Sequence, residues 1–100
     1  QKEKIILTEE LRKYIVQANS IAEKGDYFKS LELYEKAMQL DPFSYPIAYY
    51  NMALVAAELK LFNYAVFNMK KYLLIQPDSP ETRKVQDKIY EWEINSPLTK

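Results

Sequence analysis

The chain contains neither cysteine nor histidine, and only one glycine in 100 residues. Without cysteine it has no disulfide, thiolate nucleophile or cysteine metal site, and the redox state of its compartment stays open. Without histidine it lacks the commonest general base and the commonest metal ligand. A single glycine excludes glycine-rich phosphate loops, which need at least two. We therefore expect a protein that is not an enzyme, with no catalytic residue, no metal site and no cofactor.

Long apolar runs are also missing. The longest, residues 52–57, falls far short of the ~20 residues that span a bilayer, so no membrane insertion is predicted. Fourteen basic residues balance fourteen acidic ones, and a neutral chain has no overall field to attract nucleic acid. No signal peptide is visible, and the chain begins with Gln1, so we expect a processed or excised fragment. The favoured compartment of this soluble chain is the cytoplasm, with the periplasm as the alternative for a processed fragment.

What is present indicates one small globular domain spanning residues 1–100, since 48% of the chain is hydrophobic and 28% charged. Its central stretch is residues 25–42. Gly25 can adopt the positive φ that ends one helix, Asp26 can cap the next, and Pro42 closes it. The apolar stripe of this helix consists of Tyr27, Leu31, Tyr34 and Met38. Leu33, Ala37 and Leu40 widen it, so other helices must flank it on two sides.

Start and stop signals divide the chain into five helices without a strand. Thr8 is a suitable N-cap, with acidic residues in the turn that follows, and Pro46 suits the first position of a helix. Asp78, Ser79 and Pro80 resemble a further start signal. The expected helices span about 9–24, 27–40, 46–60, 62–75 and 79–94, with residues 1–7 as a lead-in arm and residues 95–100 as a tail.

The chain also repeats itself at a fixed distance. The pairs aligned by a shift of 35 residues include Tyr14 with Tyr49, Ala18 with Ala53, Glu23 with Glu58, Lys36 with Lys71 and Pro42 with Pro77. This pattern resembles the tetratricopeptide repeat family, although its period is one residue longer than the family's 34. The family's slots hold Tyr14, Gln17, Ala18, Ile21, Ser30, Tyr34 and Pro42 in the first repeat, and Tyr49, Met52, Ala53, Ala56, Ala65, Met69 and Pro77 in the second. The departures are Gln17 in an apolar slot, Lys60 in the place of Gly25 and Tyr72 in the place of Ala37.

The resemblance implies an all-α fold, a right-handed α–α superhelix, or solenoid. It would contain two helix-turn-helix repeats, residues 8–42 and 46–77, and a C-terminal capping helix, residues 79–94. In that helix Val85, Ile89 and Trp92 form one apolar stripe, which would cover the end of the second repeat. The alternative is that this stripe begins a third repeat.

For such a fold the family resemblance implies a non-catalytic module that binds another protein or a peptide on its concave surface. The residues that helical spacing and the resemblance place there are Arg12, Ile15, Val16, Asn19 and Glu23 in the first repeat, and Ile47, Tyr50, Asn51, Leu54 and Glu58 in the second. Asn19 and Asn51 can hydrogen-bond an extended peptide backbone, so the surface suits a partly hydrophobic peptide. The alternative is that Ile15 and Leu54 contact the lead-in arm or the fifth helix.

A narrower possibility within the family is a clamp for the acidic C-terminal tails of chaperones. Asn19 and Asn51 occupy its two asparagine slots, but its three basic slots fall on Ile15, Glu81 and Val85. Without basic groups a terminal carboxylate has no charge-assisted partner, so we reject the clamp. Two function classes stay open. A monomeric adaptor, alone or within a larger scaffold, is favoured, and a self-associating module that forms a homodimer through its repeat ends is the alternative.

Overall fold

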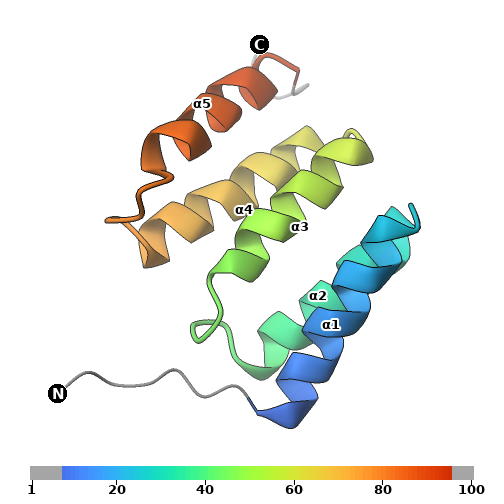
Figure 1. The fold of residues 1–100 in the computed structure, drawn as a ribbon. Coiled ribbons are helices and arrows are strands. Elements are labelled where there is room, and N and C mark those ends of the chain that lie inside the picture. The colour runs from blue at the N-terminus through green and yellow to red at the C-terminus, as the bar shows by residue number, and fades with distance from the viewer. Residues whose placement is uncertain (1–7, 96–100) are drawn as a thin grey trace, which may run out of the picture.

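The computed structural model describes residues 8–95, which contain five α-helices and no strand (Figure 1). The helices are α1 (Glu9–Glu23), α2 (Tyr27–Leu40), α3 (Ile47–Glu58), α4 (Phe62–Ile75) and α5 (Thr82–Glu93). The prediction of an all-α chain is confirmed. None of these helices is long and apolar enough to cross a membrane. The lead-in arm, residues 1–7, and residues 96–100 of the tail lie outside the described residues.

Two of the predicted caps hold the first two helices. The Thr8 hydroxyl accepts a hydrogen bond from the Leu11 amide at 3.1 Å, and the Asp26 carboxylate accepts one from the Lys29 amide at 3.2 Å. Each cap satisfies a backbone N–H group that has no partner inside its helix. α1 and α2 therefore begin where the sequence predicts.

The two turns that close α1 and α3 have the same geometry. Gly25 has a φ of +86° and Lys60 a φ of +63°, both in the left-handed region. In each turn an amide bonds back across the helix end, Asp26 to Ile21 at 3.2 Å and Leu61 to Ala56 at 2.9 Å. A shift of 35 residues also carries the bounds of α2 onto those of α4. The sequence period is thus a period of the structure, and Lys60 occupies a backbone conformation that suits glycine.

Lys60→Gly is expected to raise the free energy of unfolding by roughly 0.5–1 kcal/mol. The left-handed conformation costs a residue with a Cβ ~1–2 kcal/mol, and part of the gain is lost to the greater freedom of glycine in the unfolded chain. Chemical denaturation followed by circular dichroism measures the change. Gly25→Ala is the matched control and should destabilise by about 1 kcal/mol, because nothing lies within 4 Å of the added Cβ and only the backbone resists it. A Lys60→Gly protein that is less stable than the wild type would contradict the expectation.

Small side chains stand where paired helices approach each other. Ala18 and Ser30 are fully buried between α1 and α2, and the Ser30 hydroxyl donates to the Ala18 carbonyl at 2.9 Å. Ala53 and Ala65 are fully buried at the equivalent positions of α3 and α4. This agrees with the predicted reason for small residues at these slots, because a larger side chain would hold the helices apart.

The helix pairs stack in chain order. Figure 1 shows the pair α3–α4 between the pair α1–α2 and the last helix, α5. α2 packs on α3, and α4 packs on α5. One continuous core runs through the stack, with Leu11 and Tyr34 near one end and Ile89 and Trp92 near the other. This order brings residues of α1, α3 and α5 to one side of the molecule.

α5 begins at Thr82, three residues later than predicted. The Ser79 hydroxyl accepts from the Glu81 amide at 3.0 Å, and the Thr82 hydroxyl donates to the Ser79 carbonyl at 2.6 Å. Ser79 therefore organises a turn before the helix instead of capping it. α3 likewise begins one residue later than predicted, at Ile47 instead of Pro46.

α5 spans the residues that a shift of 35 from α3 would give, yet it buries a different face. Its buried side chains are the predicted stripe, Val85, Ile89 and Trp92. The positions equivalent to the buried Tyr49, Ala53 and Ala56 of α3 carry Lys84, Lys88 and Glu91. A helix packed on α5 as α4 packs on α3 would bury these charges, which is costly. The structure therefore favours a covering role for α5 over a third repeat.

Candidate partner-binding face

Two adjacent hollows lie on the side of the molecule formed by α1, α3 and α5. The first hollow, of about 340 Å³, is lined by Asn19, Ala22, Glu23, Tyr34, Asn51, Leu54 and Val55. The second hollow, of about 450 Å³, is lined by Leu54, Ala57, Glu58, Lys60, Phe62, Lys88 and Trp92. Leu54 belongs to both and is 37% exposed, so it forms the ridge between them. We call the two hollows together the partner-binding face.

The two hollows are equivalent by the period of 35 residues but differ in chemistry. Asn19, Ala22 and Glu23 of the first hollow correspond to Leu54, Ala57 and Glu58 of the second. The shift thus replaces a hydrogen-bonding amide with an aliphatic side chain. The first hollow is suited to polar groups of a ligand and the second to an apolar one.

Tyr34 of α2 forms the floor of the first hollow. Its ring is buried, and its hydroxyl donates a hydrogen bond to Asn19 Oδ1. Burial raises the pKa of Tyr34 to about 12, against an opposing effect of the nearby Asn51 side chain. The hydroxyl is therefore protonated at neutral pH, bonds an amide of α1 and lies near an amide of α3. Both asparagines are half-buried, so the rest of each amide stays accessible.

The second hollow has an apolar wall and a charged rim. Leu54, Phe62 and Trp92 supply the wall, and Trp92 is only 6% exposed. Lys88 Nζ lies 5.9 Å from the centroid of the Trp92 ring and 3.7 Å from the Glu91 carboxylate. Glu58 and Lys60 complete the rim. An apolar side chain of a ligand could occupy this hollow with polar groups of both signs around it.

The two hollows bring together five of the ten residues that were expected on the concave surface. Those that line the two hollows are Asn19, Glu23, Asn51, Leu54 and Glu58. Leu54 shares the second hollow with Lys88 and Trp92 of α5, so it faces the same hollow as the last helix, whose contact with Leu54 was the alternative prediction.

The prediction that Ile15 is exposed to a partner is wrong. Ile15 is 4% exposed, because it continues the buried stripe of α1 between Leu11 and Ala18. Spacings of four and three residues place all three side chains on one face of the helix, which faces the core. Ile15 therefore contributes to stability and offers no surface to a ligand.

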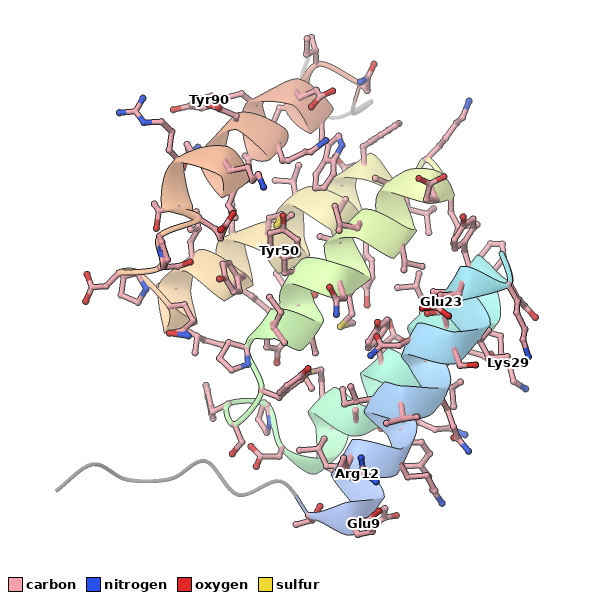
Figure 2. The ribbon with its side chains drawn as sticks, viewed as in Figure 1. Glu9, Arg12, Glu23, Lys29, Tyr50 and Tyr90 are labelled. Carbon is pink, nitrogen blue, oxygen red and sulfur yellow. The ribbon has the colours of Figure 1, made fainter. Side chains whose placement is uncertain are left out.

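The other predicted residues lie outside the hollows. Figure 2 shows Arg12 and Glu23 at opposite ends of α1, and Arg12 pairs with Glu9 at 3.3 Å. Ile47 is the first residue of α3 and, like Arg12 and the exposed Val16, lines neither hollow. Tyr50 is half-buried, with its ring edge-on to that of Tyr72 at 5.5 Å between centroids, so it joins α3 to α4.

Sequence reasoning assigned Tyr34 and Trp92 to the core and gave Lys60, Phe62 and Lys88 no role, yet all five line the hollows. One signal was visible: Lys60 occupies the slot of Gly25. The burial of Tyr34 and Trp92 follows from their stripes, but their position at the edge of a hollow depends on how three helices meet.

A further hollow, of about 420 Å³, lies between α2 and α4, away from the partner-binding face. Glu35 accepts a hydrogen bond from the Tyr64 hydroxyl, and Asn68 donates to the Tyr64 carbonyl at 2.9 Å. Burial, and then Glu35, raise the pKa of Tyr64 well above its usual value. Lys71 lies over the rings of Tyr49 and Phe67. These polar groups have intramolecular partners, so this hollow has a weaker case for a ligand than the partner-binding face.

Comparison with models of known protein families and with curated proteins finds no match for this chain.

Proposed function

We propose that this protein is a non-catalytic interaction module that binds an extended segment of another protein along its partner-binding face, alone or within a larger scaffold. The observation that carries the proposal is the pair of adjacent hollows, one hydrogen-bonding and one apolar, separated only by Leu54. Ligand sites combine apolar walls with a few placed polar groups in this way. The resemblance to tetratricopeptide repeats supports the same conclusion, and with it the arrangement of the helices as a solenoid of two repeats and a capping helix.

Each hollow has a part in this mode of binding. Asn19 accepts from Tyr34 through Oδ1, which leaves its amide hydrogens for a backbone carbonyl of the ligand. Asn51 stands on the other side of the same hollow and can serve a backbone N–H group. The ridge at Leu54 and the wall of the second hollow then receive a neighbouring apolar side chain. Backbone bonds provide affinity in such recognition, and side-chain pockets provide specificity.

Leu54→Asp is expected to weaken the binding of peptides by at least about tenfold, because it places a charge on the ridge between the hollows. The ligands are peptides selected from a random library displayed on phage with the wild-type protein as bait. Their dissociation constants are then measured for each variant by fluorescence anisotropy.

Leu74→Asp is the matched control, because Leu74 is 82% exposed on α4 and lines neither hollow. Both variants should keep the helical signal, since exposed positions tolerate substitution. Peptides that lose affinity for the Leu74 variant while binding the Leu54 variant normally would place the site elsewhere and contradict the proposal.

The second candidate function is self-association, and exposed apolar side chains at the C-terminal end of the described chain favour it. Leu74 is 82%, Ile94 79% and Tyr90 62% exposed, and Figure 2 shows Tyr90 at the outer edge of α5. Exposed apolar side chains of this size can contribute to an interface between copies. Sedimentation equilibrium of the isolated domain separates the candidates. We expect a monomer, whereas a dimer that Leu74→Asp dissociates would favour self-association.

A further inference from the structure

Lys60 holds a backbone conformation that disfavours it. Its φ of +63° matches the +86° of Gly25 at the equivalent turn, so glycine would satisfy the same turn without strain. Non-glycine residues held in the left-handed region cluster at functional sites, so such a residue motivates a functional hypothesis. Lys60 is therefore a candidate for a functional side chain, unless its contacts within the fold give a reason for it.

No contact within the described residues supplies that reason. None of the four ion pairs among residues 8–95 includes Lys60, and the side chain is exposed. None of the cation–aromatic contacts in that part of the chain includes it either. Lys60 lines the second hollow and has no ion-pair or cation–aromatic partner among residues 8–95.

The second hollow also determines what a ligand must present there. Its rim carries two cations, Lys60 and Lys88, against one anion, Glu58. Glu91 lies 3.7 Å from Lys88 but does not line the hollow. The wall beneath them is apolar, with Leu54, Phe62 and the Trp92 ring. Since Lys88 already pairs with Glu91, Lys60 is the rim cation that has no ion pair among residues 8–95. A cation above an apolar wall suits a ligand that places a carboxylate beside a large aliphatic side chain.

We propose that the second hollow is a specificity subsite for a partner segment in which an aliphatic residue is followed by an acidic one. The aliphatic side chain packs on Leu54 and Trp92, and the carboxylate is held by Lys60, with Lys88 adding positive charge at the rim. This inference rests on the proposed function and deepens it, because it names the sequence class of the partner. It differs from a clamp for a terminal carboxylate, because the anion here is a side chain.

Two blocked tetrapeptides test the subsite: acetyl-glycyl-leucyl-glutamyl-glycinamide and the same peptide with glutamine in place of glutamate. Trp92 is the only tryptophan of the chain, so its fluorescence reports occupation of the hollow. We expect the glutamate peptide to bind about fivefold more tightly than the glutamine peptide at low salt, the scale of a partly exposed ion pair. The preference should shrink at about 0.5 M salt, where exposed charges are screened.

Lys60→Gly is expected to abolish the preference for glutamate although it stabilises the fold, so unfolding cannot account for the loss. Lys88→Gln should reduce the preference in the same direction. Lys24→Gln is the control, because Lys24 lies beside Gly25 at the equivalent turn and lines neither hollow. It should leave the preference unchanged.

Equal binding of the two peptides to the wild type would overturn the acidic subsite and leave the proposed function standing. A preference for glutamate that survives in the Lys60→Gly protein would also overturn it. Binding of neither peptide, with no change in Trp92 fluorescence up to millimolar concentration, would count against both the subsite and the proposed function.

Discussion

Replacing Trp92 with alanine is expected to lower the free energy of unfolding by about 3 kcal/mol, the usual cost of truncating a buried aromatic side chain. The ring is 6% exposed and lies with Val85 and Ile89 on the one face that α5 buries. These three side chains are the only ones that α5 buries, so removing the largest of them takes away much of the contact between α5 and α4. The variant should unfold at a clearly lower urea concentration than the wild type, which equilibrium denaturation monitored by circular dichroism measures.

Tyr90→Ala is the control for this prediction. Tyr90 is an aromatic residue of the same helix, two positions earlier, but it is 62% exposed. Its replacement should change the stability by no more than about 0.5 kcal/mol, as is usual for exposed positions. A loss below about 0.5 kcal/mol for Trp92→Ala, in a protein that stays monomeric, would place Trp92 on the surface and remove the covering role of α5.

Local signals explain why the sequence predicts most helix bounds. A cap such as Thr8 or Asp26 satisfies backbone groups within three residues of itself, so its effect can be read without knowledge of the fold. The glycine at position 25 acts through its own φ. The start of α5 was missed because Ser79 can either cap a helix or form a turn. The structure selects the turn, where the Ser79 hydroxyl also contacts that of Tyr72 at 2.9 Å.

The partner-binding face was predicted less well. Helical spacing shows which face of a helix a residue lies on, but it does not show which other helix packs against that face. Spacing places Ile15 and Asn19 on nearly the same face of α1. Ile15 is nevertheless buried in the core, with 4% of its surface exposed, whereas Asn19 lines the first hollow. Tyr50 also lies on the face predicted to bind a partner, but its ring packs against that of Tyr72 in the next helix. Such outcomes depend on contacts between helices, which no local pattern encodes. The period still relates Asn19 to Leu54 and Glu23 to Glu58, and these equivalent positions line the two hollows.

Replacing Tyr34 with alanine is expected to be at least as damaging as the change at Trp92, with a loss of about 3–5 kcal/mol. Tyr34 is 2% exposed and is among the largest fully enclosed side chains of the core. It lines the first hollow with residues of α1 and α3, and its hydroxyl bonds Asn19 and lies near Asn51. Alanine would remove both the ring and this connection. The free energy of unfolding from urea denaturation measures the loss against a total that is on the order of 5–15 kcal/mol for a small domain.

Tyr34→Phe separates the two roles of this residue, because it keeps the ring and deletes only the hydroxyl. The loss of one hydrogen bond should cost about 1 kcal/mol, since both asparagines are half-buried and can turn to water instead. The fold should persist, while the side-chain amide signals of Asn19 and Asn51 shift in nitrogen–proton NMR spectra as the amides lose their fixed partner. Peptides selected on the wild type should then bind more weakly to the variant, because the amides are no longer oriented for a backbone. Unchanged side-chain amide signals of Asn19 and Asn51 would show that the Tyr34 hydroxyl does not position these two asparagines. A loss of stability as large as that of Tyr34→Ala would instead show that the hydroxyl, and not the ring, holds this part of the core together.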